Sequence, residues 1–337
     1  MGVDGSASAS DGDLRAYLPY VEASTDFVPV AQRTKYWESY NASELVGLRC
    51  SAYSSCGLRA RERNFDLGAL RLADIDGNEH VVERTASMLR RHPKDSIFAC
   101  LLLQGEAFFY QSGSCIRVNE GDLIVYGTTM PYLYGFTRDM RQLLVDIDPA
   151  RLGPEGGALR PAAPIKIGGG LRSGGRLTGA LRQTLCDFVS QPLASDAERV
   201  GHRVQLLLQA VLEPSAPGER PTQSSSAVRL VRAEAFIDEN LASPGLSAAL
   251  VARHVCVSVR QLDRIFARHG CTATQWIWQQ RLERARCSLS DPGRLGLTVG
   301  EIALQCGFAT QAHFGGAFRA RYGTTPMEHR VGSALRR

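Results

Sequence analysis

The C-terminal third of this 337-residue chain contains one pattern twice, at a separation of about 51 residues. The matching positions are apolar or helix-capping residues in the same order: Leu246-Ser247 and Leu297-Thr298, Val251-Ala252 and Ile302-Ala303, Cys256-Val257 and Gly307-Phe308. After one inserted residue, the correspondence continues with Ser258, Leu262 and Phe266 against Thr310, Phe314 and Phe318. A repeat of this kind predicts one supersecondary unit that is built twice.

Each copy contains the parts of a helix-turn-helix. Ser247 or Thr298 can cap a first helix, and Thr298 with Glu301 has the spacing of a capping box. A tight turn follows, after which Ser258 or Thr310 can cap a second helix. The sequence therefore predicts two helix-turn-helix units, at about residues 246–269 and 297–320.

Positive charge is concentrated in the same part of the chain. Residues 226–337 contain fifteen arginines, no lysine and eight acidic residues, a net charge of +7, whereas the whole chain has +5. The rest of the chain is therefore slightly acidic. This asymmetry is typical of a nucleic-acid-binding domain attached to another domain, although a solvated basic surface would also produce it.

The first predicted recognition helix has an apolar face and a polar face. Leu262, Ile265 and Phe266 form the apolar stripe. The candidates for base contact on the other face are Arg260, Asp263 and Arg264. Arginine donates two hydrogen bonds to guanine and aspartate accepts one from cytosine. The alternative is a solvated surface pair between Arg260 and Asp263.

The second predicted recognition helix has fewer side chains to offer. Gly315 and Gly316 lie on its outward face, so its base-contact candidates are Gln311 and His313. The candidates for DNA backbone contact are Ser258, Arg268, Thr310, Arg319 and Arg321, with Arg281, Arg284 and Arg330 as further basic positions. Each of these could equally be a solvated surface residue.

The N-terminal part has a different pattern. Between about residues 45 and 147, short β-branched and aromatic runs alternate with turn residues, which predicts an antiparallel sandwich or barrel. The turn Asn119–Asp122 predicts a hairpin between its neighbouring runs. Two helix-spaced apolar series follow, Leu177 to Phe188 and Val204 to Val211. These helices either pack on the β domain or pair with a second subunit in a homodimer.

Composition sets the boundaries. Residues 213–227 are rich in Pro, Ser and Gly and predict a linker, which places a β-rich domain at 30–212 and a DNA-binding domain at 228–334. Residues 1–29 are expected to be disordered or poorly ordered, without the features of a signal peptide.

The nine cysteines contain no C-x-x-C pair, and no apolar run is long enough to span a bilayer. We expect a cytoplasmic protein.

These residues resemble the AraC family of bacterial transcription regulators. The matching positions are Val251-Ala252, Ser258-x-Arg260-x-Leu262-x-Arg264-x-Phe266, Glu301-Ile302-Ala303, Gly307-Phe308, His313-Phe314, Ala317-Phe318-Arg319, Tyr322-Gly323, Thr325-Pro326 and His329-Arg330. The resemblance implies a sequence-specific DNA-binding regulator, in most relatives an activator, whose two recognition helices enter successive major grooves of promoter DNA. RNA polymerase is then an expected partner.

The chain departs from the family pattern at two positions. Cys256 stands at a turn where the family usually has glycine, so the turn is either strained by about 1 kcal/mol or differently folded. Gly316 replaces an arginine that commonly contacts bases.

Upstream, the segment Tyr36-Trp37-Glu38-Ser39-Tyr40 and the following strands resemble the AraC-binding-like sensor domain, a cupin-type barrel. The implied fold is α+β multidomain: an N-terminal antiparallel β-barrel with flanking helices and a C-terminal all-α domain with two helix-turn-helix units. The resemblance also implies a small organic effector.

The candidates for the effector pocket, chosen by alternation along the strands, are Phe98, Cys100, Leu102, Phe108, Tyr110, Tyr132 and Tyr134. Arg141 could pair with a carboxylate of the ligand. Each aromatic residue could instead be plain core.

The alternative from another class is a metal-free or metal-dependent cupin-type enzyme fused to a DNA-binding domain. Such an enzyme clusters histidines with a carboxylate, yet residues 96–148 contain no histidine. We therefore expect no catalytic residues, no metal and no cofactor.

Overall fold

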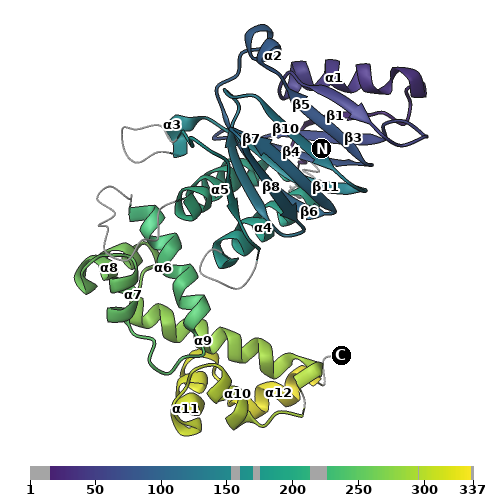
Figure 1. Cartoon of the computed structure of the whole chain (residues 1–337). Coiled ribbons are helices and arrows are strands. Elements are labelled where there is room, and N and C mark those ends of the chain that lie inside the picture. The colour runs from purple at the N-terminus through teal and green to yellow at the C-terminus, as the bar shows by residue number, and fades with distance from the viewer. Residues whose placement is uncertain (1–15, 153–159, 170–174, 213–225, 295, 335–337) are drawn as a thin grey trace, which may run out of the picture. The chain divides into compact units, whose positions relative to one another are not determined.

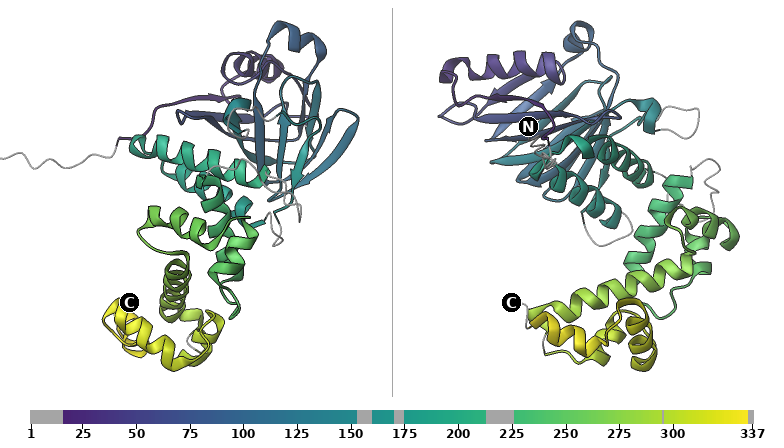
Figure 2. Two further views of the ribbon diagram at one scale, coloured as in Figure 1. Left: turned by 90° about the vertical axis from the view of Figure 1, so that its left-hand side faces the viewer. Right: turned by 180° about the vertical axis from the view of Figure 1, so that it is seen from behind.

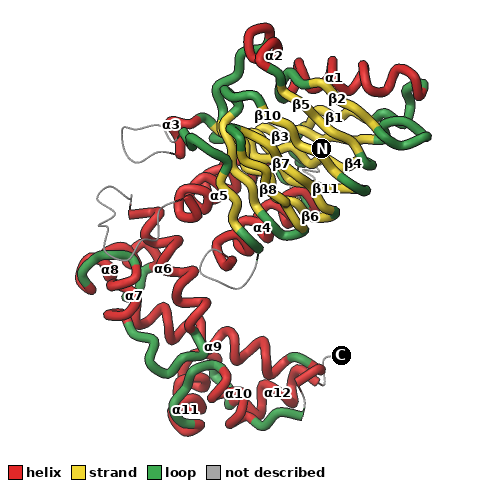
Figure 3. Tube along the Cα trace, in the orientation of Figure 1, coloured by secondary structure: helices red, strands yellow, loops and turns green. Residues whose placement is uncertain are grey.

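The computed structural model describes residues 16–152, 160–169, 175–212, 226–294 and 296–334 (Figure 1). The chain divides into two compact units, one formed by residues 1–170 with 178–205 and the other by 171–177 with 206–337. The first unit is rich in strands and the second is helical (Figure 3), which confirms the α+β multidomain class. The predicted linker lies outside the described residues except for Ser226 and Ala227, which begin a helix.

The N-terminal unit contains two antiparallel sheets. The strands of the seven-stranded sheet are, in spatial order, β1 (Tyr20–Ser24), β3 (Ala60–Asp66), β4 (Arg71–Gly77), β11 (Met140–Ile147), β6 (Ile97–Gln104), β9 (Leu123–Gly127) and β12 (Ile165–Ile167). Those of the five-stranded sheet are β2 (Arg49–Ala52), β5 (His80–Arg84), β10 (Tyr132–Phe136), β7 (Glu106–Gln111) and β8 (Ser114–Asn119). The predicted antiparallel β domain is confirmed, but as two separate sheets rather than a closed barrel.

The inner faces of the two sheets share one apolar core. Phe109 of β7 is fully buried, and its ring centroid lies 4.3 Å from that of Tyr126 on β9. Helix α1 (Arg33–Glu44), which follows the short helix η1 (Val30–Gln32), adds Trp37 to this core. Helices α2 (Ala86–Arg91) and α3 (Pro149–Leu152) complete the connections. The core is thus formed by side chains that alternate along both sheets.

Two local predictions were wrong. Residues 16–29 are not disordered: β1 pairs with β3, because Tyr20 to Ser24 can extend the sheet at its edge. The turn Asn119–Asp122 forms, with Asp122 N donating to Asn119 O at 3.0 Å, but it does not close a hairpin. Strand β8 pairs with β7 in one sheet, while β9 pairs with β6 and β12 in the other. The turn therefore carries the chain between sheets, which local sequence does not distinguish from a hairpin.

The two helices after the sheets use their apolar faces within the chain. In α4 (Gly175–Ser190), the Phe188 ring lies edge-on to Phe65 of β3, 5.8 Å between centroids. In α5 (Ala197–Leu212), which follows η2 (Ala194–Asp196), a Cβ on Gly201 would lie 2.4 Å from Leu67 O. Both helices run beside the sheets in every view (Figure 2). Their apolar positions Leu177, Leu181, Leu185, Phe188, Val204, Leu207 and Leu208 are buried in a single chain, whereas Val211, the last position of the second series, is half-buried. This favours packing over subunit pairing through these stripes.

The C-terminal unit consists of two helical lobes that share α9 (Ala273–Ser290). The first lobe contains α6 (Ser226–Asn240), α7 (Ala248–His254), α8 (Val259–Phe266) and η3 (Ala267–His269). The second contains η4 (Pro292–Arg294), α10 (Val299–Gln305), α11 (Gln311–Tyr322) and α12 (Pro326–Ala334). Ala273 and Ile277 of α9 belong to the first core, whereas Leu282, Ala285 and Leu289 belong to the second. One helix therefore joins both helix-turn-helix units.

Arg281 and Gly307 connect the lobes where α9 passes from one core to the other. The buried Arg281 guanidinium donates to Leu241 O at 3.1 Å and to Ser243 O at 2.7 Å, both in the first lobe. Gly307, in the turn of the second unit, has φ +85°, and a Cβ there would lie 2.3 Å from Leu241 O. Only glycine satisfies both the left-handed backbone and this close approach.

The Gly307→Ala substitution should therefore lower the free energy of unfolding by at least about 2 kcal/mol, because it adds left-handed strain to a backbone collision. Urea unfolding of the full chain measures the loss. Gly316→Ala is the matched control: its Cβ meets no heavy atom within 4 Å, so it should raise stability by about 0.5–1 kcal/mol. Equal effects of the two substitutions would contradict the interlocked geometry.

Cys256 occupies the equivalent turn of the first unit with φ +55°. Of the two alternatives expected for this turn, strain or a different fold, the structure has the first. Cys256 keeps the left-handed backbone that favours glycine and is strained by it. Cys256→Gly should raise the unfolding free energy by about 1 kcal/mol, measured by the same urea titration. A loss of stability would show that the thiol contributes packing that outweighs the strain.

Candidate DNA interface and sensor cavity

Helix α8 presents two arginines on a face opposite its buried stripe. Ser258 caps the helix: its Oγ accepts from Gln261 N at 3.2 Å, and Ser258 N donates to Gln261 Oε1 at 3.0 Å. Leu262, Ile265 and Phe266 are buried. Arg260 and Arg264, one turn apart, are exposed. Within the described part of the chain, neither guanidinium has a carboxylate partner, so both are free to meet an acceptor.

Asp263 does not share their freedom. It is half-buried, and its Oδ1 accepts a hydrogen bond from Ala273 N at 3.0 Å, at the start of α9. The carboxylate therefore links two helices, and base contact by Asp263, expected from its position on α8, does not fit this structure. Sequence periodicity could not show this, because the Ala273 N–H comes from the next helix. Two capping boxes, formed by Ser258 with Gln261 and by Thr272 with Gln275, were also not identified from the sequence.

Helix α11 presents a smaller polar surface. Thr310 caps it by accepting from His313 N at 3.3 Å, while Phe314 and Phe318 are buried. Gln311 and His313 are exposed near its N-terminus, and the His313 ring lies edge-on to Trp278, 5.0 Å between centroids. Gly315 and Gly316 leave the rest of this face without side chains. The second helix thus has two groups able to approach bases.

The remaining basic candidates differ in availability. Arg319 and Arg321 at the end of α11 and Arg284 on α9 are exposed, whereas the side chain of Arg268 lies outside the described residues. Arg281 is only 3% exposed and burial lowers its pKa. Arg330 donates to Leu297 O at 2.8 Å. Arg281 and Arg330 both bond backbone carbonyls of the protein itself. DNA backbone contact by the buried Arg281 was therefore a wrong expectation, whereas contact by the half-buried Arg330 stays a prediction.

The predicted pocket residues separate into two groups. Phe98, Tyr132 and Tyr134 line a cavity of about 30 Å³ between the sheets, hereafter the interior cavity. Cys100 and Leu102 are buried in the same core but do not line it.

Phe108 and Tyr110 were wrongly assigned to the pocket, because β7 buries the alternate positions Ala107, Phe109 and Gln111. Phe108 lies against Gly135 on the outer face, and Tyr110 is 50% exposed. The run of three consecutive aromatic residues hid the phase of the alternation.

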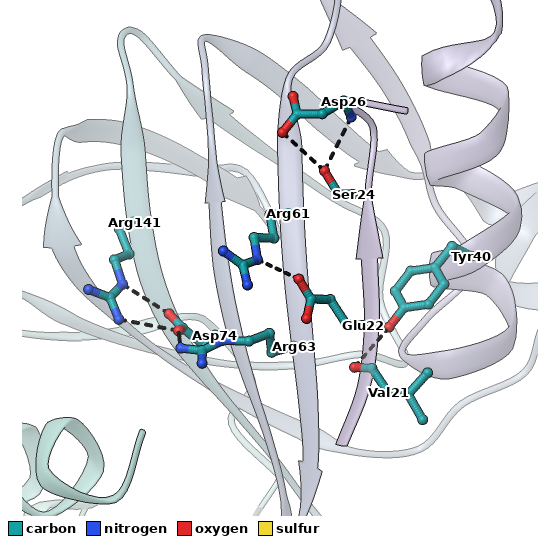
Figure 4. A network of polar contacts seen from close by, with 9 residues as sticks. All are labelled: Val21, Glu22, Ser24, Asp26, Tyr40, Arg61, Arg63, Asp74 and Arg141. Carbon is teal, nitrogen blue, oxygen red and sulfur yellow. Dashed lines mark hydrogen bonds and ion pairs between the residues drawn. The ribbon is translucent and has the colours of Figure 1, made fainter. Parts of the chain in front are cut away.

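Arg141 is also turned away from the interior cavity. Its Nε lies 3.0 Å from Asp74 Oδ1, and Arg63 Nη2 bonds the same carboxylate at 2.5 Å (Figure 4). Asp74 alternates with the inward residues Ala73 and Ile75, so this triad lies on the outer face. The suggestion that Arg141 pairs with a ligand carboxylate in the pocket is therefore wrong.

No three His, Cys, Asp or Glu side chains among the described residues come together in a way that could hold a metal ion. No helix in the described ranges has the length and apolarity needed to cross a membrane. All nine cysteines are free thiols.

Two domain models and several known proteins are similar to this chain. The AraC-binding-like domain model matches residues 37–262, and a helix-turn-helix domain model matches residues 251–331. The transcriptional activator NphR of Rhodococcus sp. is 26% identical over 281 residues, covering 79% of this chain and 80% of that protein. The regulator ArgR of Pseudomonas aeruginosa is 37% identical over 107 residues, 32% of this chain and 31% of ArgR. The crystal structure of the AraC-like activator CuxR superposes with a TM-score of 0.49 at 20% identity, covering 85% of this chain and 100% of that one.

The domain match spans more than half of the chain, and the chain therefore belongs to the AraC family of transcription regulators. It is a DNA-binding transcription regulator with an N-terminal sensor-type domain, as the sequence predicted.

Arg281→Leu tests whether this arginine stabilises the fold or binds DNA. The substitution leaves Leu241 O and Ser243 O without their donor, so the unfolding free energy should fall by about 2–3 kcal/mol. The dependence of DNA affinity on salt concentration should stay unchanged, since no phosphate contact is lost. Arg284→Ala, exposed on the same helix, should change stability by less than about 0.5 kcal/mol. A weaker salt dependence with unchanged stability in Arg281→Leu would instead assign it to DNA.

Proposed function

We propose that this chain is an effector-responsive activator that binds promoter DNA through α8 and α11. The observation that carries the proposal is the pair of exposed, unpaired arginines on α8, held one turn apart by a capped helix with a buried opposite face. The name of its relative NphR, a transcriptional activator, supports activation. RNA polymerase is then the expected partner at the promoter, and the cytoplasm the expected compartment.

Base recognition is assigned to four side chains. Arg260 and Arg264 each donate two hydrogen bonds to a guanine edge in the major groove, while Gln311 pairs with adenine and His313 approaches a neighbouring base or phosphate. Arg268, Arg319 and Arg321 contact the phosphate backbone, aided by the hydroxyls of Ser258 and Thr310. Because Gly315 and Gly316 add nothing, α8 supplies most of the sequence preference.

The proposed division of labour follows the predicted ranges. Residues 30–212 bind a small organic effector, and residues 228–334 bind DNA. The effector acts by changing the relative stability of two arrangements of the chain or its dimer. A homodimer would use mainly surfaces other than the apolar stripes of α4 and α5, since most of their positions are buried within one chain.

The cupin-type enzyme is not proposed. The relatives that cover the chain or its helical part are named as regulators, and no observation favours catalysis.

Arg260→Ala should weaken binding to the preferred DNA site by about 1–3 kcal/mol and relax the preference at one base position. Arg321→Ala is the matched control, an exposed arginine assigned to phosphate: it should weaken all sequences alike and reduce the salt dependence of binding by about one counterion. Fluorescence anisotropy on single-base variants of the site measures both. A uniform loss from both substitutions would reject the assignment of Arg260 to bases.

Genome-wide mapping of binding sites in the native host tests the function as a whole. Discrete peaks at promoters, with loss of expression of the adjoining genes when the protein is deleted, are expected. Peaks whose genes rise on deletion would reverse the sign to repression. A flat profile under every growth condition, from a protein that is present and folded, would reject the proposal.

A further inference from the structure

The interior cavity of the N-terminal unit carries information about what it binds. It lies between the inner faces of the two sheets, and α1 closes it on one side with Trp37 and Asn41. Its walls are mainly aromatic, with Phe98, Tyr126 and Phe136 among them. Flat aromatic walls favour a ring-containing ligand, which can pack face-on or edge-on against them.

Two side chains in this wall each have an unpartnered polar atom. Tyr134 Oη and Gln142 Oε1 accept or donate no hydrogen bond within the described residues, and their residues are only 1% and 5% exposed. Both residues line the interior cavity. A buried hydroxyl and a buried amide are costly to leave unsatisfied, so such groups usually have a partner in the functional state. A ligand hydroxyl that accepts from Tyr134 and donates to Gln142 would satisfy both.

His80 offers a third polar function. Its Nδ1 lies 2.6 Å from Asn78 O, and because a carbonyl only accepts, Nδ1 carries the proton. Nε2 is then an acceptor on a residue that lines the interior cavity. Burial lowers the pKa of His80, which keeps the ring neutral.

No charged group in the wall can balance a charged ligand. All fifteen lining residues have uncharged side chains, given a neutral His80. The buried Arg84 is not available, since its guanidinium donates to Thr128 O, Gly47 O and His92 O. On the same inner face, Glu62 lies in register with Ile75 and Gln142, and burial raises the pKa of its carboxyl to about 7. A carboxylate or an ammonium ligand would thus meet no counter-ion among the lining residues, since Glu62 is not one of them.

Taking the interior cavity as the effector site of the proposed function, we propose from these contacts that the effector is an uncharged aromatic compound bearing a hydroxyl group. This proposal rests on the proposed effector response and names the chemical class of the effector. The hydroxyl lies between Tyr134 and Gln142, and the ring packs among the aromatic walls.

Binding requires the interior cavity to expand. A volume of about 30 Å³ accommodates one or two water molecules and not a benzene ring. The strand walls are fixed by ladder hydrogen bonds, and α1 is itself tied to β2, because Cys50 N donates to Glu38 Oε1 at 2.8 Å. The ligand therefore has to displace wall side chains, Trp37 among them, and tryptophan fluorescence should change on binding.

Isothermal titration calorimetry on the full chain tests the class with three probes that share one ring: benzyl alcohol, benzoate and benzylamine. Benzyl alcohol should bind saturably, and both charged probes at least about tenfold more weakly. Tighter binding of benzoate or benzylamine would overturn the proposal, as would the absence of saturable benzyl alcohol binding.

Two substitutions separate binding from folding. Tyr134→Phe and Gln142→Leu each remove an unsatisfied buried group, so the midpoint of thermal unfolding should equal or exceed that of the wild type. Both should weaken benzyl alcohol binding about fivefold or more. Tyr110→Phe, on the outer face, is the matched control and should change neither. Unchanged affinity in stable Tyr134→Phe and Gln142→Leu proteins would overturn the assignment.

DNA binding, measured in parallel, keeps the two proposals distinct. Failure of benzyl alcohol to bind a protein that still binds its DNA site overturns the ligand class alone. Saturable binding that leaves DNA affinity and promoter activation unchanged supports the ligand class and rejects the effector response.

Discussion

The DNA-binding unit depends on the way α9 passes from one helical core into the other. At that point Arg281 donates to two carbonyls of the first lobe, and the glycine turn of the second lobe packs against one of those carbonyls. These contacts leave no room for a larger residue at position 307 and no alternative partner for Leu241 O. The two helix-turn-helix units are thereby fixed to each other through one helix, so we expect α8 and α11 to approach DNA as one body.

The two helix-turn-helix units differ in backbone strain and in the side chains on their outward faces. The first helix-turn-helix keeps Cys256 in a left-handed conformation that favours glycine, yet it presents the better-equipped recognition helix. The second has glycine in its turn and also glycines on its outward face, where side chains would meet bases. On the function proposed above, this asymmetry leads us to expect sequence preference mainly from α8 and positioning mainly from α11.

Much of this was predictable because the information is local. The repeat, the caps at Ser258 and Thr310 and the buried stripes follow from spacing along one helix, and the structure has them where they were expected. The failures concern partners that are distant in sequence. Asp263 bonds the first residue of the next helix, Arg281 bonds the connection between α6 and α7, and the turn at Asn119 changes sheets rather than closing a hairpin. The pocket residues of β7 were assigned the wrong phase because three adjacent aromatic residues give period-two alternation no contrast.

We expect α8 and α11, which are linked through α9 and offer unequal sets of side chains to bases, to bind one DNA site together. Selection of binding sequences from a pool of random duplex DNA by the purified full chain tests it most directly. The expected motif has two blocks with centres separated by about 10 base pairs, one strongly conserved and guanine-containing and the other weak. A motif with a single block, two equally informative blocks, or no enrichment over the starting pool would contradict the account.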